Sequence, residues 1–173
     1  MNGYKSAAVA LVAFTLGAAP VAAQDARTVD VTPYVALGSP GTSPVGIAVT
    51  LPVASNFGIE TEVAYRRGEG HFNALSTNAS LVWFLPRIGQ ATPYLAAGLG
   101  LSQYGALVVS SAGAPIGTER RLAMTVNAGG GLKMPVKDRI DLRTDIRWTV
   151  SPGAQRPEQL RVAQGISLAV GKR

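Results

Sequence analysis

The feature that most constrains this chain is an alternation of residue types with a period of two, which recurs in eight segments after a short leader. Successive side chains of a β-strand point to opposite faces, so this period predicts strands. In each segment one set of alternate positions is uncharged, whereas the other set holds almost all of the charge within the segments. An uncharged face opposite a polar one is the pattern of a barrel that stands in lipid.

The alternation predicts strands over residues 28–38, 44–52, 56–66, 71–85, 92–104, 119–133, 139–150 and 158–170. Short turns are expected at 53–55, 86–91 and 134–138, and longer links rich in Gly, Ser and Pro at 39–43, 67–70, 105–118 and 151–157. Turns at one end and loops at the other are typical of outer-membrane barrels. We therefore predict an all-β fold, an eight-stranded antiparallel up-and-down transmembrane β-barrel. The uncharged link 105–118 is expected to be the outward contact loop, because loops on rigid scaffolds carry variable function.

The two faces differ in chemistry. Val45, Ile47, Val49 and Leu51 illustrate the uncharged set, which is expected to face lipid because a charge there is costly. The interleaved set is expected to face the barrel interior, which in eight-stranded barrels is just wide enough for side chains. The charged members of this inner set are predicted to form barrel-interior ion pairs: Asp30, Glu60, Glu62, Asp141, Arg143, Asp145, Arg147 and Arg161.

The first 23 residues predict a cleavable signal peptide. Lys5 supplies a positive start, an apolar run extends from Ala7 to Gly17, and small residues precede a cut ahead of Gln24. The apolar run of 11 residues is too short for a helix across the hydrocarbon core, which takes about 20 residues. Residues 1–23 are thus a signal for export through the inner membrane, and residues 24–173 form one barrel domain.

Composition excludes several classes of function. The chain has no Cys and a single His, so a disulfide framework and a transition-metal site are not expected. Aromatic and basic residues are not interleaved as nucleic-acid binding requires. The glycines at 98–100 and 129–131 lack the spacing of nucleotide-binding loops and lie within strand patterns, where they leave space for an inward ring such as Tyr34 or Tyr94. We expect no metal, no cofactor and no nucleic-acid partner.

Two stretches carry a resemblance to a known family. The segment 92–102, TPYLAAGLGLS, and the segment 127–148, NAGGGLKMPVKDRIDLRTDIRW, resemble strands of the small outer-membrane β-barrel family that includes OmpA- and OmpX-type proteins. The resemblance implies a location in the outer membrane of a Gram-negative-type cell envelope, insertion by the barrel-assembly machinery and contact with outer-membrane lipid. The final residues, 167–173, lack the terminal aromatic residue that family members usually carry.

The leading hypothesis is a non-enzymatic, monomeric outer-membrane barrel with a structural or surface-interaction role, its interior plugged by ion pairs. The expected outer rim gathers arginines that could bind lipopolysaccharide phosphates: Arg66, Arg67, Arg120, Arg121 and Arg156. One alternative is a soluble exported, lipocalin-like barrel that binds a small apolar ligand and turns the apolar set inward. Another is an outer-membrane lipid hydrolase that uses His71, although Asn73 stands where such enzymes place a serine two positions after the histidine.

Overall fold

The computed structural model describes residues 28–38, 43–67, 73–109, 113, 115–152 and 158–171. The predicted signal peptide, residues 1–23, lies outside these described residues. Eight strands follow in chain order: β1 (Val29–Gly38), β2 (Val45–Pro52), β3 (Phe57–Arg66), β4 (Ala74–Phe84), β5 (Thr92–Val109), β6 (Pro115–Lys137), β7 (Ile140–Val150) and β8 (Glu158–Val170). None of the described segments is a helix long and apolar enough to span a membrane.

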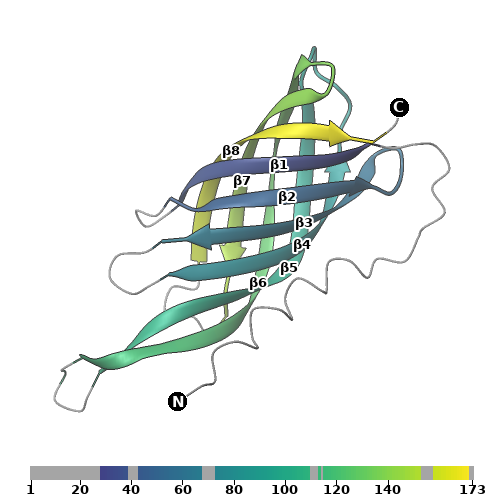
Figure 1. The fold of residues 1–173 in the computed structure, drawn as a ribbon. Helices are drawn as coiled ribbons and strands as arrows, with labels where there is room; N and C mark the ends of the chain where they lie inside the picture. Colours follow the sequence, from purple (N-terminus) through teal and green to yellow (C-terminus); the bar gives the residue numbers. More distant parts are fainter. Residues whose placement is uncertain are drawn as a thin grey trace.

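The strands form one closed barrel (Figure 1). Each strand pairs antiparallel with the next, and β1 closes the ring by pairing with β8, with Tyr34 opposite Gly165. Because the barrel is closed, every strand has a neighbouring strand on both sides. Its backbone groups therefore have hydrogen-bond partners on both sides wherever the two neighbours extend alongside it. The predicted all-β, eight-stranded antiparallel barrel is confirmed.

The alternation of side chains has the predicted orientation. Along β3, Glu60 and Glu62 are buried, whereas Ile59 and Val63, which flank them, are exposed. Every position predicted to face outward is exposed or half-buried, and none is buried. The interior is lined mostly by polar, small and tyrosine side chains: Thr32, Tyr34, Ala48, Thr50, Glu60, Glu62, Ser80, Tyr94, Thr125, Asn127, Arg143, Asp145, Arg147 and Ser167. An apolar exception is Val82, which packs with Phe84 against Tyr94.

Two glycines make room for the interior rings. A Cβ atom at Gly46 would lie 2.5 Å from the hydroxyl of Tyr34, and one at Gly131 would lie 2.5 Å from the hydroxyl of Tyr94. Such a Cβ would also clash with the backbone carbonyl of the neighbouring strand, that of Val63 at Gly46 and that of Thr144 at Gly131, so a side chain at either position would displace both the ring and the strand. The rings of Tyr34 and Tyr94 lie against bare backbone, as the sequence predicts.

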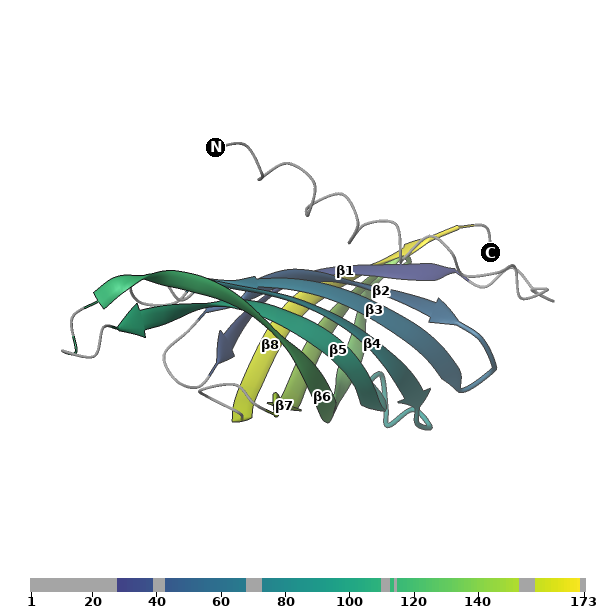
Figure 2. The same cartoon turned by 90° about the horizontal axis from the view of Figure 1, so that it is seen from below.

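The predicted loop at 105–118 is wrong. Strands β5 and β6 continue through most of it, with Gly105 opposite Arg120 and Val108 opposite Gly117, and the register shifts between Val108 and Val109. Pairing of β5 with β4 stops at Tyr104, so the hairpin extends past its neighbour. Figures 1 and 2 both show this hairpin projecting beyond the other strands. A composition rich in Gly, Ala and Ser obscured the strand pattern, but cross-strand backbone hydrogen bonds require no particular side chain.

The opposite end of the barrel has short connections. Strand β6 runs to Lys137, and the turn that joins it to β7 is residues 138–139, shorter than the predicted turn at 134–138. The link between β4 and β5 contains a bridge from Ile88 to Ala91. Gly89 within this link has a φ of 62°, a conformation that favours glycine. We call this the turn end of the barrel and the other the loop end.

Candidate functional site

The charged side chains of the interior meet in a central cluster. Glu60 comes from β3, and Arg143, Asp145 and Arg147 occupy alternate positions of β7, so all of them point inward. The Glu60 carboxylate accepts from Nη1 of Arg143 at 2.5 Å and from Nη2 of Arg147 at 2.5 Å. Asp145 lies 3.0 Å from Nε of Arg147 and 3.4 Å from Nη2 of Arg143. The cluster contains two carboxylates and two guanidinium groups, so its formal charges balance.

Neutral side chains complete the hydrogen bonding of this cluster. Tyr94 donates its hydroxyl to Asp145 at 2.7 Å and accepts from Nε of Arg143 at 2.7 Å. Its ring also lies 4.6 Å from the Arg143 guanidinium, at cation–π distance. Thr50 donates to Glu60 at 2.9 Å. Buried charges are stable only when such additional bonds occupy their remaining donors and acceptors.

A second layer lies toward the loop end. Arg161 of β8 makes a two-pronged bond to Glu62 of β3, at 2.8 Å from Nη1 and 2.7 Å from Nη2. This is the geometry in which a guanidinium and a carboxylate interact most strongly. Arg161 also donates to the hydroxyl of Tyr34 at 2.9 Å and lies 3.5 Å from Asp145, which connects this layer to the central cluster.

A third layer lies at the turn end. Lys133 of β6 is 2.6 Å from Asp30 of β1 and 3.3 Å from Asp141 of β7. Its ammonium group also lies 5.9 Å from the centre of the Phe84 ring. Each of the eight charged residues predicted for the interior therefore takes part in an ion pair there.

The partner that sequence reasoning missed is Lys133. Lys133 has the inward parity of Gly129 and Gly131, but it is the last residue of the predicted strand 119–133 and is not among the residues predicted to pair inside the barrel. In the structure β6 continues four residues further, to Lys137, so Lys133 lies within the strand and not at its end.

The arrangement provides no evident catalytic group. Glu60 and Glu62 are two positions apart, as a pair of acid and base groups can be, but each is bound by guanidinium donors and is buried. General acid–base catalysis needs a group that can reach a substrate atom. Across the described residues, no group of three or more His, Cys, Asp or Glu could hold a metal ion. His71 lies outside the described residues.

The interior opens at the loop end into a cavity of about 60 Å³. Arg161 lies on its wall, and Arg66 of β3 is half-buried beside it. Most of the remaining lining is polar and comes from strands all around the barrel: Ser76, Asn78, Ser102, Thr125, Thr149, Ser151 and Gln159. On the other side of Arg161 a much smaller void of about 10 Å³ lies beside Tyr34 and Asp145.

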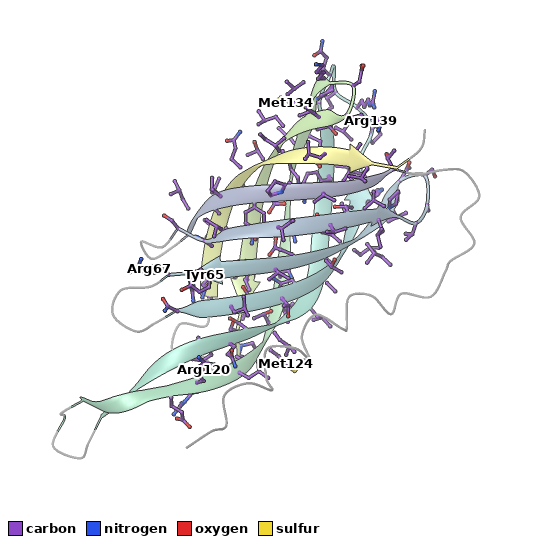
Figure 3. All side chains as sticks on the ribbon, viewed as in Figure 1. Tyr65, Arg67, Arg120, Met124, Met134 and Arg139 are labelled. Atoms are coloured by element: carbon purple, nitrogen blue, oxygen red, sulfur yellow. The ribbon has the colours of Figure 1, made fainter. Side chains whose placement is uncertain are left out.

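The predicted rim arginines are divided between two environments. Arg67, Arg120 and Arg121 are exposed, and Figure 3 shows Arg67 and Arg120 at the loop end, with Arg139 at the opposite end. Arg121 pairs with Glu119 at 3.2 Å, and both side chains are more than half exposed. Arg66 lines the cavity, and Arg156 lies outside the described residues.

No family model matches the chain, and no curated protein matches it. Several solved structures are similar to it in fold. The N-terminal β-barrel domain of Pseudomonas aeruginosa OprF superposes with a TM-score of 0.62 at 14% identity, covering 84% of this chain and 99% of that one. Neisserial surface protein A superposes with a TM-score of 0.60 at 14% identity, covering 83% and 95%. The chain has the fold of the small outer-membrane β-barrels.

This fold does not by itself distinguish binding from catalysis. The outer membrane enzyme PagL also superposes, with a TM-score of 0.53 at 14% identity, covering 80% of this chain and 98% of PagL. At such low identity the likeness shows the fold alone, because function depends on a site and not on the scaffold.

Proposed function

We propose that this chain is a non-enzymatic barrel of the cell outer membrane, with a structural or surface-interaction role. One observation carries the proposal: the charged side chains in the middle of the strands are inside, and most of the large apolar side chains are outside. Leu99, Leu122 and Met124 are 59%, 65% and 65% exposed, whereas Glu60 is 1% exposed. Soluble proteins rarely expose a continuous apolar surface of this kind. In lipid the same surface is favourable.

The aromatic side chains support the same placement. Phe57 and Trp83 stack outside the barrel at the turn end, with ring centres 6.2 Å apart, and both are exposed. Tyr65 and Trp148 are exposed nearer the loop end. Exposed aromatic residues toward both ends of the strands match the belts with which membrane barrels contact the two lipid interfaces.

Membrane fractionation followed by gel electrophoresis with and without heating tests the location. We expect the protein to sediment with the outer membrane, to be released only by detergent, and to change its gel mobility on heating. Release by salt or carbonate without detergent would refute the proposal. It would also favour the soluble, lipocalin-like alternative, which needs an apolar interior in place of the polar one seen here.

The interior ion pairs lead us to propose a plugged barrel without an open pore. The three charged layers span the interior between the turn end and the cavity at the loop end. The void beside Asp145 has room for about one water molecule. The purified protein in planar lipid bilayers should therefore show no discrete conductance steps at neutral pH. Stable single-channel currents, absent from a mock purification, would contradict the plug.

We also propose that the exposed rim arginines bind lipopolysaccharide phosphates. Arg67, Arg120 and Arg121 carry positive charge at the loop end, and guanidinium groups bind phosphate oxygens in pairs. Replacing all five predicted rim arginines, the ones at 66 and 156 included, with Gln should reduce co-purified lipopolysaccharide. The matched control replaces Arg87, Lys137 and Arg139, which are exposed at the turn end. Unchanged lipopolysaccharide in the rim variant would remove the hypothesis.

Insertion by the barrel-assembly machinery and a monomeric state complete the proposal. Depleting the machinery should reduce the folded protein in the outer membrane, and light scattering in detergent should give the mass of one chain. The enzymatic alternative has a separate test, because it depends on His71. Cleavage of radiolabelled lipid A by the wild-type protein, lost in a His71→Ala variant, would support the hydrolase and overturn the non-enzymatic assignment.

A further inference from the structure

The β6–β7 hairpin contains an irregularity close to its tip at the turn end. Strand β6 pairs regularly with β7 as far as Pro135, which lies opposite Asp141. The register then shifts by one residue, so that Lys137 lies opposite Ile140. The extra residue, Val136, makes a β-bulge, and bulges commonly redirect the side chains that follow them. The bulge therefore decides which face of the barrel the last residue of β6 occupies.

The bulge places Lys137 on the outer face. Residues directly opposite each other in an antiparallel pair share one face of the sheet. Ile140 has the parity opposite to that of the buried Arg143, so Ile140 and its partner Lys137 lie on the outer side. Without the extra residue Lys137 would have the parity of Lys133, which pairs with two carboxylates inside the barrel. A shift of one residue thus moves a cation from the interior to the lipid-facing surface.

Lys137 ends an apolar stripe of that surface. Leu132, Met134 and Val136 precede it on β6, and they are 43%, 39% and 69% exposed. Lys137 itself is exposed, and Figure 3 shows Met134 and Arg139 at this same end of the barrel. A lysine in such a place lays its methylene groups along the apolar surface and holds its ammonium group in the polar layer. In a membrane that layer contains the lipid phosphates.

Arg139 adds a second cation two residues further along the chain. It is exposed, and its carbonyl accepts a hydrogen bond from the amide of Ala169 in β8 at 3.0 Å, which holds the turn against the next strand. Asp138, between the two cations, is exposed and has an interaction of its own. Two cations and one acid leave these three residues with a net positive charge. Ion pairs between exposed residues are weak, so a phosphate can compete with the acid.

We propose that Lys137 and Arg139 bind the phosphate of an anionic phospholipid in the membrane leaflet at the turn end. Basic residues beside a membrane-embedded segment favour anionic lipids, and a guanidinium donates paired hydrogen bonds to phosphate oxygens. A zwitterionic headgroup carries its own cation and gains less. The occupant is a lipid and not dissolved phosphate, because the apolar stripe below Lys137 is complementary to acyl chains. This inference rests on the proposed membrane location.

Titration of the isotope-labelled protein, folded in a zwitterionic detergent, with short-chain phosphatidylglycerol tests the site by NMR. Short-chain phosphatidylcholine of equal acyl length is the reference lipid. We expect saturable shifts of the backbone amides of Lys137, Arg139 and Ile140, and unchanged amides at Ser102 near the loop end. Phosphatidylglycerol should bind about fivefold more tightly than phosphatidylcholine, which is the factor that one basic residue near an anionic lipid typically provides. Sodium phosphate should cause no saturable shift.

Three variants test the geometry of the site. Lys137→Gln should remove most of the fivefold preference, whereas Arg67→Gln, which removes an exposed cation at the loop end, should leave it within about twofold. Combining Lys137→Gln with Ile140→Lys returns the ammonium group to the same face and should restore the preference. Deletion of Val136 keeps every charge but gives Lys137 the inward parity, so the preference should be lost.

Several results would overturn the site: equal affinity for the two lipids, saturable shifts with sodium phosphate, equal losses in the Lys137 and Arg67 variants, or an undiminished preference after deletion of Val136. Tighter binding of lipopolysaccharide than of phosphatidylglycerol at these amides would overturn the assignment to a phospholipid. Heat-dependent gel mobility verifies that each variant is folded, and if the deletion variant is not, the Ile140→Lys combination decides. A protein that sediments with the outer membrane but shows no lipid preference would refute this inference and leave the proposed location standing.

Discussion

Replacing Glu60 with glutamine tests whether ion pairs hold the interior of this barrel together. Glu60 is 1% exposed and binds Arg143 and Arg147, both at 2.5 Å. Glutamine preserves the shape and one acceptor oxygen but removes the negative charge. Asp145 would then be the only carboxylate facing both guanidinium groups of the central cluster, which leaves a net positive charge in an enclosed interior.

Removing one partner of a buried ion pair typically destabilises a protein by about 3–5 kcal/mol. Because about 1.4 kcal/mol corresponds to a factor of ten, we expect the unfolding equilibrium constant to rise roughly a hundredfold or more. Urea unfolding of the protein in lipid vesicles measures this change, followed by the fluorescence of Trp83 and Trp148, the only two tryptophans. Both the midpoint of the urea unfolding curve and the dependence of the unfolding free energy on urea concentration are needed, because a change in the latter would indicate a changed unfolded state.

Two further variants separate charge imbalance from general disruption. Glu119→Gln removes a carboxylate whose 3.2 Å pair with Arg121 is more than half exposed, so it should cost less than about 1 kcal/mol. Combining Glu60→Gln with Arg147→Gln restores the charge balance, so the double variant should be less destabilised than the sum of the single variants. If Glu60→Gln proves no more harmful than Glu119→Gln, the interior pairs do not stabilise the barrel and the reasoning fails.

Three other predictions use the same unfolding assay. Leu99→Arg places a charge on the outer face midway along β5 and should cost about 2–4 kcal/mol in vesicles, whereas a loss below about 1 kcal/mol would contradict lipid exposure. Gly131→Ala should cost about 1–3 kcal/mol by overpacking against the backbone carbonyl of Thr144 and the ring of Tyr94. Gly117→Ala, with no atom within 4 Å of the added Cβ, should leave the free energy of unfolding unchanged. Lys133→Met should cost about 1.5–3 kcal/mol, because its two carboxylate partners lose their shared cation; a neutral result would show that water replaces the lysine.

The inward and outward faces could be predicted from the sequence because a charge that faces lipid is costly. A charged residue in the middle of a strand, such as Glu62 or Arg161, therefore indicates which parity points inward. Strands β2, β4 and β5 carry no charged residue, and there the large apolar residues indicate the outward parity. Once the inward parity of one residue is known, the orientation of every other residue in the strand follows, because side chains alternate between the two faces unless a bulge intervenes. The predicted frame consequently places no outward position among the buried residues.

The choice of ion-pair partners could not be predicted in this way. The alternation of side chains predicts that Lys133 and Asp30 both point inward. Whether they form an ion pair across the barrel depends on how far the strands are staggered relative to one another. That stagger is set by the register of all the ladders together, including the one that places Lys133 opposite Arg143. The cavity at the loop end escaped prediction for the same reason, since its lining comes from small polar residues of many strands that carry no individual signal.

The interior charges and the apolar exterior depend on each other. A shift of one residue in any strand would exchange its two faces, which would move Glu60 and Glu62 of β3 into the surrounding medium and Ile59 and Val63 into the interior. In lipid such a shift would both expose charge to hydrocarbon and leave Arg161 without its carboxylate. The ion pairs therefore favour one pairing register of the strands over its neighbours, and they do so even if their net contribution to the free energy of unfolding is small. In water the first of these penalties would largely disappear, because exposed carboxylates are well solvated, whereas the unpaired Arg161 would remain costly. The separation of charge between the two faces in the middle of the strands is therefore what the proposed membrane environment requires.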